Sequence, residues 1–424
     1  MTVATEAGGC QSADALRERM AADLMADGTV TSVRVDRAFR SVPRHLFAPG
    51  AGLERVYARE IVVVKRDQHG IPVSTVSAPE IQARMLEQAQ IEPGMRVLEI
   101  GSGGYNAALC AELAGQAGQV TTVDIDPEVT ERARTFLDAA GYSQVSVVLG
   151  DGEDGVVERA PYDRILVTAG AWDIPPAWTA QLTSAGRLVV PLRMRGITRS
   201  LALEAAADRS HLVAMSAEVC GFVKMQGAGA HHERLWLLRG DRVGLRFDDG
   251  GPEHLALPDG VLGGEASAAW SGVRVGRQEP FETLPLWLAS VLPGFCGLTA
   301  DASGGGPDIA VEPGGRWFPY AAVTGDSFAY LSTRPAGDQV EFGAHGYGPH
   351  AATSAAELAR QVCAWDREQR RGPGPVIAVW PVGTAATRPR ADAGWTAVIT
   401  KAHRQVTISW PPNGQAEGHS APRE

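Results

Sequence analysis

"RVLEIGSGGYNAAL", residues 96–109, is the stretch that decides the fold of this sequence. Its first part, 96–101, is an apolar run that predicts a buried β-strand, and its last part begins a helix. Between them stand Gly101, Gly103 and Gly104, where the backbone can approach a ligand closely because a Cβ atom would collide with it. A strand that passes through a glycine turn into a helix is typical of a nucleotide-type binding site.

The segments that follow continue to alternate between strand and helix patterns. The predicted strands are 96–101, 119–126, 145–151, 162–170 and 187–192, with helices at 106–115, 127–141 and 175–186. This alternation indicates an α/β fold with a doubly wound sheet, which we assign to residues 1–240. We expect residues 241–264 to form a linker, and the pattern of 265–415 predicts a separate α+β domain.

Acidic residues stand at the ends of two further predicted strands, where ligands bind in such sheets. Asp124 lies 23 residues after Gly101 and is placed to accept hydrogen bonds from the hydroxyls of a ribose. Asp151 and Gly152 are placed to meet an adenine base. The candidate ligands are a nicotinamide dinucleotide and S-adenosylmethionine (SAM). Asn106 stands where the dinucleotide pattern needs a third glycine, so the sequence favours SAM, although glycine turns without a ligand also occur at strand–helix junctions.

Composition and charge exclude several classes of protein. The net charge is −10, which is unfavourable for a nucleic-acid binder. The five cysteines are widely spread without a CxxC pair, which argues against a disulfide framework and a zinc site. His231 and His232 have no further ligands at suitable spacing, so we expect no metal. No signal peptide or membrane helix is recognisable, and we expect a cytoplasmic protein without nucleic-acid or membrane partners.

Several motifs occur in an order that resembles one family. They include "STVSAP" at 74–79, "VTTVDIDPEVTERAR" at 120–134, "LGDGEDGV" at 149–156 and "VCGFVKMQG" at 219–227. Together they resemble protein-L-isoaspartate O-methyltransferases, which are SAM-dependent enzymes with a Rossmann-like fold that esterify a peptide carboxylate. The resemblance covers residues 12 to about 230.

The resemblance is closer to one branch, the "FxLD system" methyltransferases found with class I lanthipeptide biosynthesis, and there it continues through "FETLPLWLASVLPGFCGL" at 281–298. This implies methylation of an aspartate side chain in a ribosomally synthesised, cyclised precursor peptide, followed by succinimide or isoaspartate formation. Two departures from the repair enzymes disfavour general isoaspartate repair, which is the main alternative. The turn "GSGGYN" is one residue shorter than their usual pattern, and Glu80 replaces a family histidine.

Ser77 allows two interpretations. "SAPE", 77–80, matches a capping box with Ser77 as the N-cap, Pro79 near the helix start and Glu80 at the third position. Alternatively, the Ser77 hydroxyl binds the substrate carboxylate beside the SAM methyl group, and the resemblance implies this role. A carboxylate is already ionised at pH 7, so the reaction needs orientation rather than a strong base.

The resemblance and the spacing together define the predicted site. The predicted catalytic residues are Ser77 and Thr75. The predicted cofactor contacts are Glu99, Gly101, Ser102, Gly103, Gly104, Asn106, Asp124, Ile125, Asp151, Gly152 and Thr168. The predicted substrate contacts are Ser77, Ala78, Ala169, Gly170, Trp172, Arg193 and Arg195.

The C-terminal domain is expected to select the cyclised peptide, with the aromatic segments 284–295 and 315–320 supplying part of the surface. A stabilising or dimerising appendage is the alternative, and the sequence leaves the oligomeric state open. A noncatalytic peptide-binding scaffold and a dehydrogenase remain as alternatives for the whole chain.

Overall fold

A computed structural model describes residues 12–239, 242–276, 278–300, 309–310, 318–384 and 394–412. The chain divides into two compact units. The first unit is Met1–Leu192, Arg199–Arg209 and Ala214–His231, and the second is Arg193–Thr198, Ser210–Val213 and His232–Glu424. The last change of unit falls between His231 and His232, where the prediction placed it at residue 240, and three strands between residues 182 and 219 contribute residues to both units.

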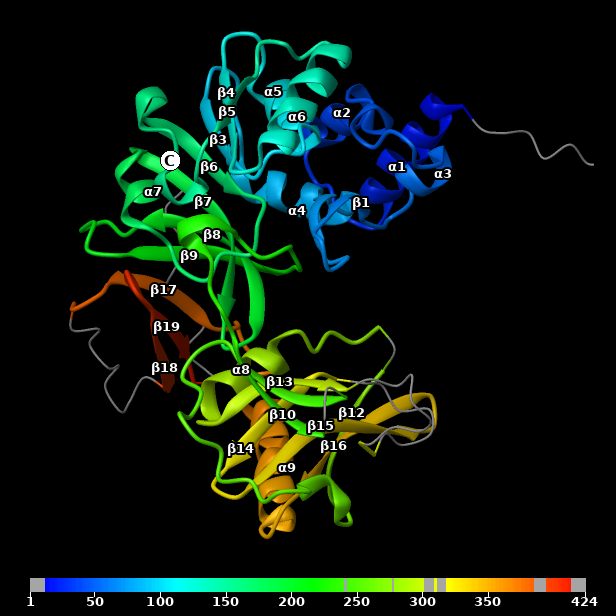
Figure 1. Ribbon diagram of the computed structural model, residues 1–424, viewed down its shortest axis with the longest axis vertical. Coiled ribbons are helices and arrows are strands. Elements are labelled where there is room, and N and C mark those ends of the chain that lie inside the picture. The colour runs from blue at the N-terminus through cyan, green and yellow to red at the C-terminus, as the bar shows by residue number, and fades with distance from the viewer. Residues whose placement is uncertain are drawn as a thin grey trace, which may run out of the picture. The chain divides into compact units, whose positions relative to one another are not determined.

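The first unit is built on a sheet that is parallel around its centre (Figure 1). Its strands are β3 (Arg96–Ile100), β4 (Gln119–Asp124), β5 (Ser146–Leu149), β6 (Tyr162–Val167), β7 (Leu182–Met194), β8 (Ile197–Ala205) and β9 (Leu212–Val219). The order is β5-β4-β3-β6-β7-β8-β9. The chain builds outward from β3 first on one side and then on the other, which confirms the predicted doubly wound fold. Ligands bind at the carboxyl ends of strands at such a switch point.

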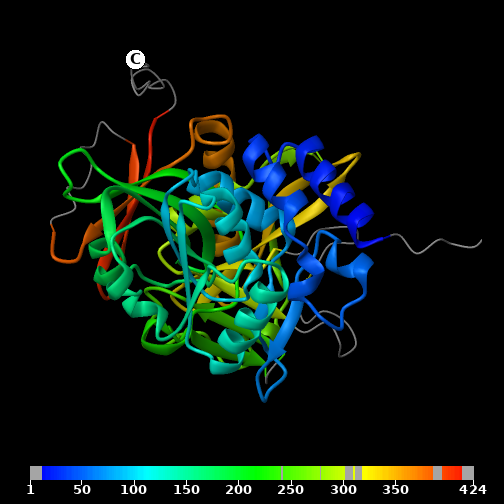
Figure 2. The same cartoon turned by 90° about the horizontal axis from the view of Figure 1, so that it is seen from above.

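Helices precede the strands of this sheet and alternate with them. They are α1 (Ala13–Ala26), α2 (Val33–Ser41), α3 (Leu53–Val56), α4 (Pro79–Ala89), α5 (Tyr105–Ala114), α6 (Pro127–Ala139) and α7 (Pro176–Ala180). Figure 2 shows the dark-blue helices α1 and α2 beside the lighter-blue helices that follow them, and α2 contacts both α4 and α5. Fully buried Phe39, Leu86 and Leu109 belong to their shared apolar core. Burial of apolar surface of this kind is the main stabilising contribution to the unit.

Two short elements precede α4 and matter for the site. The 3-10 helix η1 (Arg44–Phe47) follows α2, and a hairpin of β1 (Val62–Arg66) and β2 (Pro72–Val76) leads into α4. Lys65 on this hairpin is paired with Asp126, 2.6 Å away, and with Glu128, 2.7 Å away, at the start of α6. These ion pairs join the hairpin to the segment that follows β4.

One predicted helix is largely replaced by a strand. We expected residues 175–186 to be helical, but α7 contains only Pro176–Ala180 and β7 already begins at Leu182. The two prolines start the helix as expected. Residues 182–186 instead extend β7, whose Leu182 pairs with Tyr162 of β6, so tertiary pairing decides the structure there.

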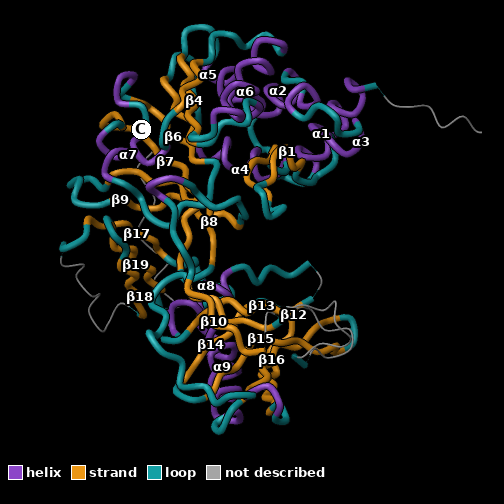
Figure 3. The backbone as a smooth tube through the Cα atoms, viewed as in Figure 1, coloured by secondary structure: helices purple, strands orange, loops and turns teal. Residues whose placement is uncertain are grey.

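The second unit contains an antiparallel seven-stranded sheet in the order β10-β11-β13-β14-β15-β16-β12. These strands are β10 (Arg234–Arg239), β11 (Val243–Phe247), β12 (Ser267–Val275), β13 (Phe295–Ala300), β14 (Tyr320–Thr324), β15 (Ser327–Ala336) and β16 (Gln339–Tyr347). The long helix α9 (Ala351–Glu368) packs on β12, β15 and β16, as Figure 3 shows in purple against orange. Strands β17 (Val376–Pro381), β19 (Arg404–Trp410) and β18 (Trp395–Thr400) pair in that order.

Two expectations about this region are wrong. Residues 241–264 are not a continuous linker, because β11 lies within them and pairs with β10 and β13. The segment 284–295 does not provide an exposed surface for a peptide, because helix α8 (Thr283–Val291) buries its apolar side chains, Trp287 included. Residues 315–317 of the other aromatic segment lie outside the described residues. No helix in the described part of the chain is both long enough and apolar enough to cross a membrane.

Candidate active site

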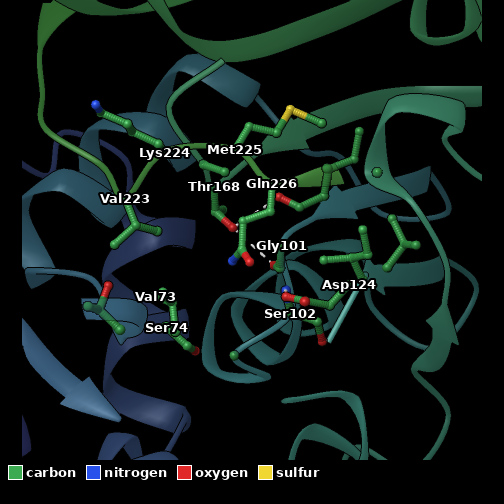
Figure 4. Close-up of a pocket in the computed structure, with 17 residues that line it drawn as sticks. Val73, Ser74, Gly101, Ser102, Asp124, Thr168, Val223, Lys224, Met225 and Gln226 are labelled. Carbon is green, nitrogen blue, oxygen red and sulfur yellow. Dashed lines mark hydrogen bonds between the residues drawn. The ribbon is translucent and has the colours of Figure 1, made fainter. Parts of the chain in front are cut away.

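A pocket lies at the carboxyl ends of β3, β4 and β6, at the switch point of the sheet (Figure 4). The space between its lining atoms is about 630 Å³, part of it open to solvent. The lining residues are Val73, Ser74, Thr75, Ile100, Gly101, Ser102, Gly103, Val123, Asp124, Ile125, Gly152, Thr168, Ala169, Val223, Lys224, Met225 and Gln226. All of them belong to the first unit.

The glycine turn forms the floor of this pocket. Gly101 has a φ of +99°, and a Cβ atom there would lie 2.6 Å from Oγ1 of Thr168. The Thr168 hydroxyl in turn donates to the Gly101 carbonyl at 3.0 Å, so the threonine is held against the turn. Any side chain at Gly101 would meet both a strained backbone and this hydroxyl, which makes glycine necessary at this position.

Asp124 supplies the carboxylate of the pocket. Its two oxygens accept hydrogen bonds from the backbone N–H groups of Ser102 at 2.8 Å and Asp126 at 2.9 Å. Burial raises the pKa of Asp124, while these backbone hydrogen bonds act in the opposite direction. A carboxylate has about four acceptor positions, so acceptor capacity remains for donors from a ligand. An acceptor-only group of this kind suits the two hydroxyls of a ribose.

Asp151 holds a loop rather than lining the pocket. Its carboxylate accepts from the backbone N–H of Glu153 at 3.0 Å and from that of Ala228 at 2.8 Å. The second bond fixes the segment 223–228, and Val223, Lys224, Met225 and Gln226 of that segment form one wall of the pocket. Gly152 lines the pocket as expected, whereas Asp151 does not line it, and its contact with the cofactor stays a prediction.

Sequence reasoning missed this wall, together with Val73 and Ser74 on the hairpin. Figure 4 shows the hairpin residues and the segment 223–226 on different sides of the glycine turn, with the Lys224 amino group pointing away from Asp124. The available signal was "VCGFVKMQG", which contributed only to the family resemblance. The segment joins the site because Gly170 exchanges backbone hydrogen bonds with Val223, at 2.7 Å, and with Met225, at 3.2 Å.

Three predicted cofactor contacts lie outside the pocket wall. Glu99 is 1% exposed beneath the turn, where its carboxyl accepts from Oγ1 of Thr122 at 2.6 Å. Burial raises the pKa of Glu99 to about 7. Asn106 is buried on α5, and Gly104 packs against the Phe47 ring. These residues surround the turn and are not on the pocket wall, so their cofactor contacts stay predictions.

The capping interpretation of Ser77 is wrong. Helix α4 begins at Pro79, its N-cap is Ala78, and no side chain caps it. Glu80 does not turn back towards the Ser77 backbone, because its carboxylate is bound to Arg59 at 2.7 Å. Thr75 lines the pocket. Ser77 and Ala78 follow directly on the same segment but are not part of the pocket wall, so their substrate contacts stay predictions.

The remaining predicted substrate contacts separate into two groups. Ala169 lines the pocket, and Gly170 forms backbone hydrogen bonds to the segment 223–226. Trp172 stacks on His231 with ring centroids 3.9 Å apart. Arg193 and Arg195 belong to the second unit. Neither lines the pocket, and both are bound to internal partners, so their substrate contacts stay predictions.

Arg193 is bound to the carboxylates of Glu233 and Asp248. The guanidinium of Arg195 donates to the Ala289 carbonyl at 2.8 Å, and the Arg195 backbone N–H donates to Asp249. In the described part of the chain, no three His, Cys, Asp or Glu side chains are grouped as a metal site would require.

Comparison with known proteins identifies the family. The profile of the family "Protein-L-isoaspartate(D-aspartate) O-methyltransferase" matches residues 15–229, just over half of the chain. A relative named protein-L-isoaspartate O-methyltransferase from Methanococcoides burtonii is 46% identical over 170 residues, which cover 40% of this chain and 80% of the relative. A relative named protein-L-isoaspartate O-methyltransferase 2 from Archaeoglobus fulgidus is 42% identical over 180 residues, with 42% and 79% covered.

Solved structures with the same name also align. One protein-L-isoaspartate O-methyltransferase aligns over 85% of this chain and 96% of its own length, with a TM-score of 0.48 and 21% identity. Another, from Plasmodium falciparum in complex with S-adenosyl-L-homocysteine, aligns over 50% and 98%, with a TM-score of 0.43 and 15% identity. The family match covers strands β1 to β9, the glycine turn and the pocket. The chain therefore belongs to the protein-L-isoaspartate(D-aspartate) O-methyltransferase family, which confirms the predicted methyltransferase class and its dependence on SAM.

Proposed function

We propose that this protein transfers a methyl group from SAM to the side-chain carboxylate of an aspartate in a ribosomally synthesised, cyclised peptide of the lanthipeptide type. The pocket supports the methyl-transfer part of this proposal. Its glycine turn excludes side chains, and its Asp124 carboxylate retains acceptor capacity. SAM, when bound, supplies an electrophilic methyl group, and Asp124 would hold its ribose while Gly101, Gly103 and Gly152 make room for it.

The chemistry of the acceptor agrees with the side chains present. Among the described lining residues the one carboxylate is Asp124, and there is no histidine. A peptide carboxylate with an ordinary pKa near 4 is already ionised at pH 7, so this reaction does not need a strong general base. The segment of Thr75, Ser77 and Ala78 would orient the carboxylate with hydroxyl groups and leave its electrons free to attack. In-line placement would then supply most of the acceleration.

The presence of the second unit is the observation on which the proposed substrate rests. The two relatives are matched over about four-fifths of their own length by about two-fifths of this chain. The second unit lies almost wholly beyond the family match, which ends at residue 229. A cyclised peptide presents a larger and more fixed surface than a loose chain, and recognition of it requires more protein surface. The methyl ester would then be attacked by the next backbone nitrogen, which expels methanol and leaves a succinimide that water opens.

General repair of isoaspartyl residues is the second candidate. It is favoured by the names of the relatives and by the family match over most of the first unit. Its acceptor would be the carboxylate of an isoaspartyl residue.

Competition between substrates separates the two candidates. The wild-type protein, SAM and an equal mixture of three peptides would be incubated together, and methylation of each would be followed by mass spectrometry. The peptides are a cyclised aspartyl peptide, its linear form and a linear isoaspartyl peptide. We expect the highest kcat/KM for the cyclised form. Preference for the isoaspartyl peptide would establish repair instead, and SAM binding without turnover on any of them would indicate a peptide-binding scaffold.

A further inference from the structure

Arg44 is a fully buried cation in the first unit. Its side chain is 0% exposed and stands at the start of η1. Tyr105 and Tyr57 are the groups that interact electrostatically with it, and within the described part of the chain no carboxylate is paired with it. Burial lowers the pKa of Arg44. An unpaired buried charge is costly, so an arginine at this position requires a specific benefit.

The guanidinium bonds to two other parts of the chain, Val56 at the end of α3 and the segment 77–82. Its Nε donates to the Val56 carbonyl at 2.7 Å and one terminal nitrogen donates to Oε1 of Gln82 on α4 at 2.8 Å. The other terminal nitrogen donates to the Ser77 carbonyl at 2.8 Å. The rigid planar fork of arginine presents several donors at fixed angles, which a lysine cannot reproduce. The bond to Ser77 fixes the backbone of the residue predicted to orient the acceptor.

The same short helix also contacts the glycine turn. The Arg44 guanidinium lies 5.0 Å from the ring centroid of Tyr105, the first residue of α5. At the other end of η1, Phe47 packs on Tyr105 with ring centroids 5.5 Å apart, and a Cβ on Gly104 would lie 3.1 Å from the Phe47 ring. Helix η1 therefore contacts two segments of the proposed site. Arg44 binds the Ser77 segment, and Phe47 packs against the glycine turn.

We propose that Arg44 is a positioning residue that sets the Ser77 segment against the glycine turn. It acts through the Ser77 carbonyl and touches neither cofactor nor substrate. This inference rests on the proposed methyltransferase reaction, because it assigns Arg44 to the alignment of acceptor and methyl donor. Misplacement by about 1 Å can reduce a rate by about 100-fold, so a small shift of this segment would be visible in kcat.

The test is a double-mutant cycle of Arg44→Lys with Ser77→Ala, with peptide methylation as the assay. We expect Arg44→Lys to reduce kcat by about 10- to 100-fold and to leave the affinity for S-adenosylhomocysteine within about threefold. In the Ser77→Ala background the same change should reduce kcat by less than about twofold, because two residues that act through one interaction are not additive. Equal losses in both backgrounds would overturn the inference.

A matched control distinguishes positioning from loss of a buried arginine. Arg164 is also buried and donates to backbone carbonyls of Ala89 and Gln90 at the opposite end of α4. Arg164→Lys should reduce the melting temperature but not kcat. Gln82→Met removes one acceptor of Arg44 without removing the cation. Gln82→Met should reduce kcat less than Arg44→Lys does, and this loss should also disappear in the Ser77→Ala background. If Arg44→Lys does not fold, the Gln82→Met variant still tests the inference.

Hydrogen exchange provides a readout that does not need a substrate. Arg44→Lys should accelerate amide exchange in residues 76–82, and Arg164→Lys should leave that segment unchanged. Unchanged exchange in Arg44→Lys would overturn the inference, whatever the activity. If the wild-type protein methylates no peptide but exchange responds as expected, the reaction is wrong while the positioning of the segment by Arg44 stands.

Discussion

Replacement of Asp124 by asparagine is the perturbation that most sharply tests the cofactor site. The change keeps the shape of the side chain and one oxygen but removes the charge and one acceptor. In the native protein both oxygens are used, for the N–H groups of Ser102 and Asp126. The asparagine side chain could satisfy only one of these donors with its oxygen, and its amide NH₂ would face the other donor.

The structure sets the expected size of two separate effects. One buried N–H group loses its acceptor, which costs about 1–3 kcal/mol of unfolding free energy. A hydrogen bond to a charged acceptor contributes about 1.5–3 kcal/mol, so losing this contribution to the ribose would weaken binding of S-adenosylhomocysteine by about 10- to 150-fold. Both figures refer to a protein that still folds. Asp124→Ala removes both acceptors and should therefore show the larger loss of stability.

Asp163→Asn is the matched control for this substitution. Asp163 accepts a hydrogen bond from the Arg96 backbone N–H at 2.9 Å, at the amino end of β3 and away from the pocket. Both variants should lose stability in urea unfolding, but only Asp124→Asn should lose affinity for S-adenosylhomocysteine in calorimetric titration. Unchanged affinity in a folded Asp124→Asn protein would remove Asp124 from the cofactor site.

Three further substitutions test other parts of the site. Ser77→Ala should lower kcat and leave the melting temperature and the affinity for S-adenosylhomocysteine nearly unchanged, since Ser77 caps no helix; a marked fall in melting temperature would restore the capping role. Burial raises the folded-state pKa of Glu99 to about 7, so its carboxyl group stays protonated to a higher pH in the folded protein than in the unfolded chain. The free energy of unfolding should therefore fall by up to about 3 kcal/mol as the pH rises from about 4.5 to about 7. Glu99→Gln should remove this fall in urea unfolding at several pH values, and an unchanged profile would show that the group is not buried as described. Gly101→Ala should abolish binding of S-adenosylhomocysteine, because its Cβ would lie 2.6 Å from the Thr168 hydroxyl at a φ of +99°; calorimetry showing wild-type affinity would contradict this geometry.

The local part of the site was predictable from sequence because it is formed by short, consecutive segments. The positions of Gly101 and Gly103 follow from one local pattern, a strand that passes through a glycine turn into a helix. Parallel pairing with the next strand then brings Asp124 to the same edge of the sheet. The doubly wound fold follows from the same alternation.

The rest depends on pairing between distant segments. Met225 and its neighbours reach the pocket because the chain returns to pair with Gly170, which no local pattern indicates. Arg193 was predicted as a substrate contact, but it lies at the end of strand β7 and is paired with the buried carboxylate of Asp248. The "SAPE" pattern fits a capping box by spacing, yet Glu80 is drawn to Arg59, a partner 21 residues away.

The central claim is that the pocket catalyses methyl transfer to a peptide carboxylate. The most direct measurement follows label from methyl-labelled SAM into a peptide that contains aspartate or isoaspartate, and then tests the stability of the product in mild alkali. We expect label in the peptide with wild-type protein, loss of that label as methanol in alkali, and strongly reduced transfer by Asp124→Asn. Transfer that survives alkali would indicate methylation of nitrogen or sulfur, and no transfer to any such peptide would contradict the account.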